Sequence, residues 1–464
     1  MRYQSTRGEA PELGFEDVLL TGLARDGGLY VPANWPQLSA SALRGLRGLA
    51  YEEVAFAVLH PFVAGAVPEA ELRRMLAEAY GGFGHPAVAP LKQLDDNHWL
   101  LELFHGPTLA FKDVAMQLLA RLMDWALARR HTRATIVGAT SGDTGGAAIE
   151  AFKASRHASL FILHPHGRVS DVQRRQMTTV NSPAVHNIAI AGNFDDCQAI
   201  VKALFNDHGF RDRVGLAGVN SINWARIMAQ IVYYVTAAVS LGAPDRGISF
   251  CVPTGNFGDI YAGLVAKRMG LPIDRLIVAT NVNDILDRAL KTGRYDMRGV
   301  TPSSSPSMDI QVSSNFERLL FDVHQRDANT VRRLMASLAQ SGAFHIGARE
   351  LAEIRNEFDS GASGEDATAA TIRDTLAATG ELLDPHTAVG YAVARRQPAS
   401  ASAMVTLATA HPAKFPDAVE KACGVRPGLP QRLAHLLTAE ERFTVLPNSS
   451  EAVRDFILSS SPAA

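Results

Sequence analysis

The sequence predicts an α/β fold in which parallel sheets are flanked by helices. Short, mostly apolar runs recur at residues 134–139, 159–165, 248–255 and 275–280, and each is followed by a segment with helical spacing or a turn. Continuous apolar strands separated by helices are typical of parallel sheets that are covered on both faces. With 464 residues the chain exceeds one ordinary domain, so two or three packed units are expected.

The first ninety residues predict a separate N-terminal unit. The segment ARDGGLYVP (24–32) indicates a tight turn that leads into a short strand, and helical patterns follow at 51–59 and 69–80. GGFGHP at 81–86 then interrupts the chain. We therefore expect one domain over residues 1–90 and a second region over 91–464.

The remaining elements are predicted in the order of the chain. Apolar residues at helical spacing follow Lys112, which places this lysine at or just before a helix start. The uncharged stretch 227–244 is long enough to consider as a membrane span, but its polar residues favour a buried helix. The segments 301–309 and 360–367, rich in Ser, Pro and Gly, are predicted to be loops or mobile segments.

Composition narrows the classes of function. The formal net charge is −2, and no run of Lys and Arg offers a surface for nucleic acid, so a small-molecule partner is expected. The sequence contains three scattered cysteines, which is typical of reduced thiols in the cytosol. The N-terminal residues lack the pattern of a signal peptide, so the prediction is a cytoplasmic protein without a membrane anchor.

Two glycine-containing segments, each between a predicted strand and a helix, are candidate anion sites. They are GATSGDTGG at 138–146 and PTGNFGD at 253–259. Free amides at a helix start point toward a ligand with a favourable dipole, and glycines allow close approach. Either segment alone could be a structural turn. Together they suggest that one holds a cofactor phosphate and the other an anionic group of the substrate.

Lys112 has two interpretations. A lysine near a helix start is usually a solvated residue whose stem covers apolar surface. Here Leu109 and Phe111 supply apolar walls, and a partly desolvated lysine loses its proton more readily and becomes nucleophilic. A nucleophilic lysine together with a separate phosphate loop is the minimal set of groups for pyridoxal phosphate.

The segment HGPTLAFKD around Lys112 resembles the cofactor-lysine motif of threonine synthases, of the longer type found in bacteria and fungi. Further matches occur in order along the chain: YQSTRG (3–8), ATSGDTGGAA (139–148), NSINWAR (220–226), PTGNFGDIYAG (253–263), SSNFERLLF (313–321), DPHTAVG (384–390) and LATAHPAKFP (407–416). The resemblance covers most of the chain. It implies pyridoxal-phosphate fold type II, the tryptophan-synthase-β-like fold, with large and small α/β subdomains and a small N-terminal domain.

The resemblance also implies roles for individual residues. Lys112 would form the Schiff base with the cofactor and then transfer protons as a base. The cofactor phosphate would be held by Thr254, Gly255, Asn256, Phe257 and Gly258, and Thr409 would face the pyridine nitrogen. Asp143 occupies the place where short relatives have an asparagine that contacts the cofactor ring hydroxyl, so that contact is not carried over.

The implied reaction converts O-phospho-L-homoserine and water to L-threonine and phosphate, the last step of threonine biosynthesis. Both ends of this substrate are anionic. The candidates for one end are Thr140, Ser141, Gly142 and Thr144, and those for the other end are Asn223, Arg226, Ser314, Asn315 and Lys414.

Several alternatives remain open from the sequence. A phospho-lyase that releases 2-oxobutyrate and ammonia would use the same groups, and a serine or threonine dehydratase fits less well because of the N-terminal unit. A non-catalytic phosphate sensor would have no use for Lys112. The histidines 105, 164, 166, 386 and 411 show no metal-ligand spacing, so we expect no metal site. The oligomeric state is expected to be a monomer or homodimer.

Overall fold

Two predominantly parallel sheets form the framework of the protein in this computed structural model, which describes residues 1–460. The larger sheet has the strand order β13-β10-β9-β14-β4-β3, and the smaller one has the order β15-β7-β6-β5-β8. β3 runs antiparallel to β4, and the other pairings within these two sheets are parallel. The predicted parallel α/β fold is confirmed.

The strands of the larger sheet are β3 (Leu91–Gln93), β4 (His98–Glu102), β9 (Ile248–Pro253), β10 (Ile273–Thr280), β13 (Phe358–Ala362) and β14 (Ala403–Ala408). Those of the smaller sheet are β5 (Ala134–Ala139), β6 (Ala158–Pro165), β7 (Val185–Ile190), β8 (Leu216–Ala217) and β15 (Thr444–Leu446). Every residue of β6, β9 and β14 is buried, which explains their continuous apolar sequences. A further antiparallel pair joins β11 (Arg294–Asp296) to β12 (Ala343–His345).

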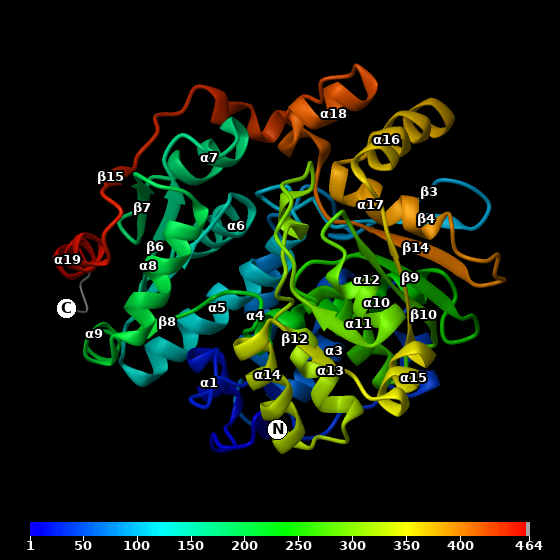
Figure 1. The fold of residues 1–464 in the computed structure, drawn as a ribbon, viewed down its shortest axis with the longest axis horizontal. Coiled ribbons are helices and arrows are strands. Elements are labelled where there is room, and N and C mark those ends of the chain that lie inside the picture. Colours follow the sequence, from blue (N-terminus) through cyan, green and yellow to red (C-terminus); the bar gives the residue numbers. More distant parts are fainter. Residues whose placement is uncertain (461–464) are drawn as a thin grey trace.

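Helices cover the faces of both sheets, and each sheet with its helices forms one of two lobes (Figure 1). The small lobe contains the smaller sheet with α6 (Asp143–Phe152), α7 (Asp171–Thr178), α8 (Phe194–Asn206), α9 (His208–Val214) and α19 (Ser450–Ser460). The larger sheet is accompanied by α5 (Lys112–Arg130), α10 (Trp224–Ser240), α11 (Gly258–Arg268), α12 (Ile285–Thr292), α13 (Phe316–Val323), α14 (Ala328–Ser341), α15 (Ala348–Glu357), α16 (Glu365–Thr379), α17 (Pro385–Ala394) and α18 (Pro416–Cys423). We call this second part the large lobe.

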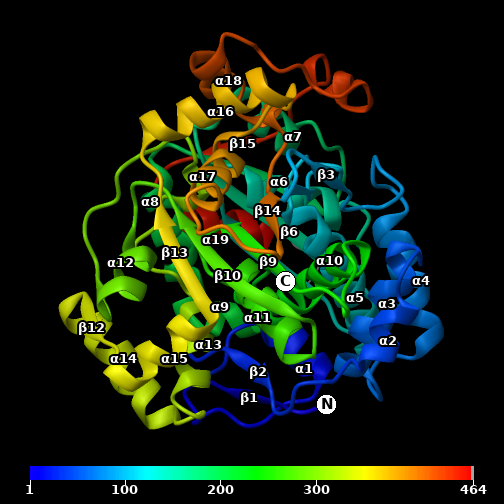
Figure 2. The same cartoon turned by 90° about the vertical axis from the view of Figure 1, so that its right-hand side faces the viewer.

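The N-terminal residues pack beside the larger sheet, as Figure 2 shows from the side. They form the antiparallel pair of β1 (Tyr3–Ser5) and β2 (Tyr30–Pro32), with α1 (Phe15–Thr21) between the two strands in the chain, followed by α2 (Ala40–Gly45), α3 (Tyr51–Val63) and α4 (Glu69–Tyr80). The turn, the strand and both helices predicted here are confirmed. The indole of Trp224 in α10 contacts the rings of Tyr3, Trp35 and Phe62, so this region shares a core with the large lobe. The domain boundary at residue 90 stays a prediction.

The uncharged stretch at 227–244 lies mostly in α10, whose residues are nearly all buried. This confirms the prediction of a buried helix. Within residues 1–460, no helix has both the length and the apolar character that crossing a membrane requires.

Of the two segments predicted as loops, 360–367 has mostly regular structure, whereas 301–309 is irregular apart from one short 3₁₀ helix. Residues 360–362 belong to β13 and residues 365–367 open α16. The glycine that suggested a loop is needed in the strand, because a Cβ on Gly361 would stand 2.9 Å from Val393 Cγ1. Residues 306–308 form the 3₁₀ helix η1 (Pro306–Met308). The carboxylate of Asp309 fixes this segment by accepting hydrogen bonds from the amides of Asn281 (2.8 Å) and Asn283 (2.9 Å).

The C-terminal residues return from the large lobe to the small lobe. After β14 the chain passes through η2 (Pro412–Lys414), α18 and η3 (Gln431–Leu437) before it adds β15 to the edge of the smaller sheet. Glu441 accepts a hydrogen bond from Arg174 Nε at 2.8 Å, and the Arg442 amide donates to the Thr178 carbonyl at 2.6 Å. The smaller sheet therefore combines strands from two distant parts of the sequence.

Candidate active site

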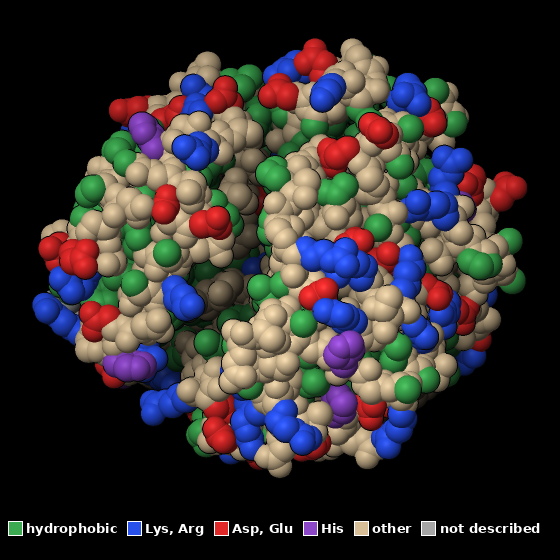
Figure 3. All heavy atoms as spheres, in the orientation of Figure 1, with side chains coloured by type: hydrophobic (Ala, Val, Ile, Leu, Met, Phe, Trp, Pro, Cys, Tyr) green, Lys and Arg blue, Asp and Glu red, His purple; other side chains and the backbone are tan. Residues whose placement is uncertain are grey.

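A cavity of about 340 Å³ lies where the two lobes meet, and Figure 3 shows the surface hollowed between them. Its volume is within the range of small-molecule sites. Most of the predicted site residues line it: Lys112, Thr140, Ser141, Thr144, Arg226, Thr254, Gly255, Asn256, Phe257, Gly258, Ser314 and Thr409. Both predicted anion loops thus face one cavity, one from each lobe.

Lys112 is the first residue of α5 and is 8% exposed. The amide of Phe111 donates to the carbonyl of Thr409 at 2.9 Å, which attaches the start of α5 to the end of β14. Lys112 Nζ lies 3.1 Å from Ser307 Oγ and 3.4 Å from Asp143 Oδ2. Burial lowers the pKa of Lys112 more than the attraction of Asp143 raises it, and the positive charges of Lys414 and Arg226 lower it further. The environment therefore favours a neutral, nucleophilic amine.

Asp143 is the first residue of α6 and lies at the centre of a buried polar network. Its Oδ1 accepts from Gln173 Nε2 at 2.9 Å and lies 3.1 Å from Lys414 Nζ. Its Oδ2 accepts from Ser307 Oγ at 3.1 Å. Burial alone would raise the pKa of Asp143, but Lys414 and Lys112 hold it well below its usual range. Asp143 is therefore an anion that lies between the side-chain nitrogens of two lysines.

The loop between β9 and α11 is built to receive an anion. α11 begins without a side-chain cap, so its first amides are available to a ligand. Phe257, directly before the helix, has a left-handed backbone with φ 61°, and its buried ring packs against Phe316 and Phe358. The ring fixes a backbone conformation that a phenylalanine rarely adopts, and strain of this kind is common where a backbone approaches a ligand.

The loop between β5 and α6 has the same design in the small lobe. α6 also lacks a side-chain cap, and Gly142 before it has φ 145°. Thr140 Oγ1 accepts from the amides of Gly142 (3.0 Å) and Gly145 (2.9 Å), so this hydroxyl fixes the shape of the loop. Ser141 and Thr144 line the cavity beside it.

Arg226 contributes a buried positive charge to the same cavity. It is 4% exposed, and its guanidinium makes one long hydrogen bond, to the Val219 carbonyl at 3.4 Å. Its Nε has no hydrogen-bond partner, and no ion pair to an acidic group is found for it within residues 1–460. Burial lowers the pKa of Arg226 to about 10, so the group stays charged at neutral pH. A buried cation without an acid lacks the partner such groups require, and an anionic ligand would supply one.

Four predicted contact residues are not among those that line the cavity, and their role toward a ligand stays a prediction: Gly142, Asn223, Asn315 and Lys414. Gly142 faces Gln173, whose amide carbon would lie 2.6 Å from a Cβ at this position. Asn223 caps α10 and donates to the Leu19 carbonyl at 2.9 Å. Asn315 donates to the Asn256 carbonyl at 2.9 Å and accepts from Arg318, so it stabilises the loop between β9 and α11. Lys414 is fully buried beside Asp143.

Ser307 and His386 line the cavity although neither was among the predicted site residues. The Ser307 amide donates to His386 Nε2 at 3.2 Å, and His386 Nδ1 lies 2.8 Å from Asp384 Oδ1. These contacts assign the proton of the imidazole to Nδ1 and fix the backbone that presents Ser307 to Lys112.

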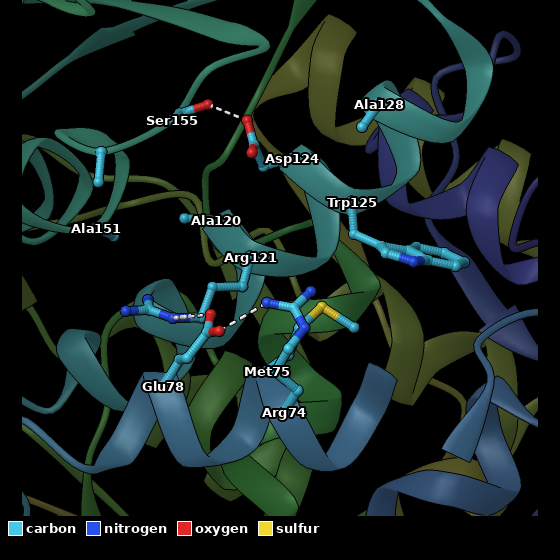
Figure 4. Close-up of a pocket in the computed structure, with 11 residues that line it drawn as sticks. Arg74, Met75, Glu78, Ala120, Arg121, Asp124, Trp125, Ala128, Ala151 and Ser155 are labelled. Atoms are coloured by element: carbon cyan, nitrogen blue, oxygen red, sulfur yellow. Dashed lines mark hydrogen bonds and ion pairs between the residues drawn. The ribbon is translucent and has the colours of Figure 1, made fainter. Parts of the chain in front are cut away.

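A second hollow lies between α4 and α5 (Figure 4). Its polar groups already have partners within the protein: Arg74 pairs with Glu78 at 2.7 Å, and Ser155 Oγ donates to Asp124 Oδ1 at 2.5 Å. It contains neither Lys112 nor an uncapped helix start, and it carries no comparable chemistry. No group of three or more His, Cys, Asp or Glu side chains suited to a metal ion occurs within residues 1–460.

The cavity fits pyridoxal phosphate by the chemistry of its groups. Lys112 supplies the amine for covalent attachment, the uncapped start of α11 suits a phosphate dianion, and Thr409 offers a hydroxyl at the end of β14. A family model described as pyridoxal-phosphate dependent enzyme matches residues 85–410. The fold and the site thus define a pyridoxal-phosphate-dependent enzyme of fold type II.

Two further family models and several relatives specify the family. The model for the threonine synthase N terminus matches residues 2–80, and the model for threonine synthase, C-terminal, matches residues 387–457. The threonine synthase of Pseudomonas aeruginosa is 58% identical over 459 residues, with 98% of each chain covered. The chain belongs to the threonine synthase family.

Solved structures agree with this assignment. The structure of PLP-bound threonine synthase from Brucella melitensis has a TM-score of 0.98 and 62% identity, with 100% of both chains covered. That of yeast threonine synthase has a TM-score of 0.94 and 38% identity, and covers 99% of this chain and 98% of that chain. The tryptophan-synthase-β-like fold, the cofactor and the family predicted from the motifs are confirmed.

Proposed function

We propose that the protein converts O-phospho-L-homoserine and water to L-threonine and phosphate, as the last step of threonine biosynthesis. The observation that carries this proposal is Arg226, a buried guanidinium without an acidic partner within residues 1–460, in the same cavity as Lys112. A substrate with an amine and two anionic ends matches a lysine-bound carbonyl cofactor flanked by separate anion sites. Guanidinium groups bind carboxylate and phosphate oxygens in bidentate geometry.

The cofactor would be held by residues of the large lobe. Lys112 would attach it, the segment Thr254–Gly258 at the start of α11 would bind its phosphate, and Thr409 would face its ring nitrogen. Bound pyridoxal phosphate supplies a carbonyl for the substrate amine and an electron sink for the carbons next to it. A neutral threonine hydroxyl would not hold the ring nitrogen protonated, which makes the ring a weaker sink than a carboxylate partner would.

Lys112 would then move protons. Its lowered pKa leaves a larger fraction of neutral amine than an exposed lysine has, so the released side chain can accept a proton from the substrate α-carbon and return it. Ser307, 3.1 Å from Nζ, orients the amine. Orientation of this kind keeps the nitrogen on one side of the bound substrate.

The two ends of the substrate would be held from opposite lobes. Ser141, Thr144 and the uncapped start of α6 would bind one end, and Arg226 and Ser314, which also line the cavity, would bind the other. Hydrogen-bond donors at a helix start stabilise the negative charge that accumulates when a phosphate group leaves. Because one end is held by each lobe, a bound substrate would draw the lobes together and exclude water.

Product analysis tests this function. The purified protein with pyridoxal phosphate is incubated with O-phospho-L-homoserine, and the products are identified by NMR. Threonine and phosphate are expected. Release of 2-oxobutyrate with phosphate would assign the protein to the phospho-lyases, and unchanged substrate with the cofactor bound would refute the proposed substrate.

The Lys112→Ala variant is the control for this experiment. It should lose the absorbance of covalently bound cofactor, and turnover should fall by roughly 10²–10⁴-fold or more, because proton transfer by a positioned side chain contributes that much. Full turnover in this variant would exclude the catalytic role of Lys112, and a phosphate sensor without catalysis would show none in either protein.

We also propose a cytoplasmic location and a monomeric or homodimeric state. All three cysteines are free thiols, which is typical of a reducing compartment. Light scattering after size-exclusion chromatography measures the oligomeric state, and a trimer or larger assembly would contradict the proposal.

A further inference from the structure

Lys414 is a fully buried lysine whose hydrogen bonds are all used inside the protein. Its Nζ donates to the Thr108 carbonyl at 2.7 Å and to Gln176 Oε1 at 2.8 Å, and lies 3.1 Å from Asp143 Oδ1. An ammonium group has three donors, so these three acceptors satisfy it. Lys414 therefore has no donor left for a substrate and no accessible surface through which to reach one.

The carboxylate of Asp143 is shared between two lysines. Oδ1 faces Lys414, and Oδ2 faces Lys112 at 3.4 Å. When both lysines are protonated, one negative charge lies between two ammonium groups in a buried site. If Lys112 loses its proton, the remaining Asp143–Lys414 pair is neutral, which is the more favourable arrangement away from water.

We propose that Lys414 is a positioning residue that acts through Asp143: it pairs with one oxygen of the carboxylate and thereby favours the neutral amine of Lys112. The inference rests on the proposed role of Lys112 as the cofactor lysine. Thr108, Gln176 and Asp143 come from three separate segments, so the position of Lys414 depends on the assembled site. Asp113 holds Thr108 in turn, by accepting from its amide and its hydroxyl at 2.7 Å each.

The direction of the effect follows from the charges. Replacement of Lys414 by Met removes a like charge from the vicinity of Lys112 and leaves Asp143 with Lys112 as its one lysine partner. Both changes stabilise the protonated form, so the pKa of Lys112 should rise. Replacement of Lys414 by Met together with Asp143 by Asn removes two effects on Lys112: the attraction to Asp143, which is the larger, and the repulsion from Lys414. The pKa of Lys112 should therefore fall below its value in the unchanged protein.

The test measures Lys112 directly in the full-length protein without cofactor. Acetic anhydride labels neutral amines, and mass spectrometry follows the labelling of Lys112 against pH, with exposed Lys421 as internal reference. Lys414→Met should shift the midpoint for Lys112 upward by about one pH unit, equivalent to roughly tenfold slower labelling at a fixed lower pH. Lys414→Arg, which keeps the charge, should restore a midpoint near that of the unchanged protein.

The double variant Lys414→Met/Asp143→Asn keeps the proposal testable if the single variant does not fold, because it removes the buried charges as a pair. Its midpoint should lie below that of the unchanged protein. An unchanged or lowered midpoint in Lys414→Met, or an unchanged or raised one in the double variant, would overturn the inference. Labelling needs neither cofactor nor substrate, so a failure of the proposed reaction would leave this result interpretable.

Discussion

Arg226 stands out among the residues of the site because its charge is buried without an acidic partner within residues 1–460. A desolvated charge without compensation destabilises the folded state. The protein retains such a group where a ligand would compensate it. Arg226 therefore favours the binding of an anionic ligand but lowers the stability of the ligand-free protein, and both effects can be measured.

Replacement of Arg226 by Met should separate the two effects. The ligand-free protein should become more stable, by about 1 kcal/mol or more in the free energy of unfolding, because an apolar side chain of similar length removes the uncompensated charge. KM for the substrate should rise roughly 30-fold or more, equivalent to about 2 kcal/mol, because an anionic group loses its cation. Urea denaturation and steady-state kinetics provide the two values. A less stable variant with unchanged KM would show that Arg226 is a structural residue.

His164, near the end of β6, gives a pH dependence that is independent of catalysis. Burial lowers the pKa of His164 from 6.5 to about 4, with smaller contributions from His166 and Arg174. In the unfolded chain the imidazole takes up a proton as the pH falls below 6.5, whereas in the folded protein it stays neutral down to about 4. The native state should lose up to about 3 kcal/mol across this window through this residue.

The His164→Gln variant tests this expectation, since it cannot titrate there. Its free energy of unfolding should decline less between neutral pH and pH about 4 than that of the unchanged protein. Exposed His208 supplies a matched control, and His208→Gln should follow the unchanged protein. If the free energy of unfolding falls by the same amount with pH in all three proteins, the contribution of His164 is ruled out.

At the scale of elements, the site depends on how η1 packs against the loop before α11. A Cβ on Gly255 would stand 2.7 Å from the Ser307 carbonyl oxygen, so the two backbones approach as closely as glycine permits. Through this contact the loop between β9 and α11 and the backbone of Ser307 fix each other's position.

Gly255→Ala should displace η1 and weaken cofactor binding. The added methyl group meets backbone rather than a flexible side chain, and strain of about 1–3 kcal/mol corresponds to a rise in Kd of roughly 5- to 150-fold. Fluorescence titration of the cofactor-free protein with pyridoxal phosphate measures this Kd. Gly428→Ala, where a Cβ meets nothing within 4 Å, is the control. Equal Kd values for both variants would contradict the proposed packing.

Elements with a strong local signal were predictable from the sequence. The apolar runs became β5, β6, β9 and β10, and the helical spacing after Lys112 became α5. β13 was missed because its Gly and Ser residues suggest a loop, whereas Gly361 is small so that Val393 of α17 can pack against it. Composition alone does not distinguish a glycine that bends the chain from one that admits a neighbouring element.

The polar network around Lys112 was not predictable in the same way. Ser307 lies 195 positions from Lys112 along the chain, and Lys414 reaches Asp143 from beyond the last strand of the larger sheet. Such contacts arise from the packing of the lobes and leave no local pattern. The Asp-Pro-His sequence at 384–386 did contain a signal, since Asp followed by Pro is typical of a helix N-terminus.

At the scale of the whole molecule, the anion-binding groups are divided between the lobes. Arg226 belongs to α10 of the large lobe, whereas Ser141 and Thr144 belong to the small lobe. A ligand with two anionic ends would bridge them. The C-terminal segment connects the lobes a second time, so their relative motion is expected to be limited in extent.

Closure should be visible in solution. A non-reactive phosphonate analogue of the substrate, added to the cofactor-loaded protein, should reduce the radius of gyration measured by small-angle scattering and slow proteolysis of the segment 438–449. Arg226→Met, which lacks the group on the large lobe, should show a smaller change. Identical scattering with and without the analogue would show that the lobes do not close.

The placement of β15 also matters while the protein is being synthesised. β7 forms as an edge strand of the smaller sheet, and its partner β15 lies at residues 444–446, after every strand of the larger sheet. A ribosome must therefore translate the helices and strands of the large lobe before that edge is covered. Until then an unpaired edge of buried, apolar residues remains open to other nascent chains, which is the condition that favours aggregation and calls for chaperones.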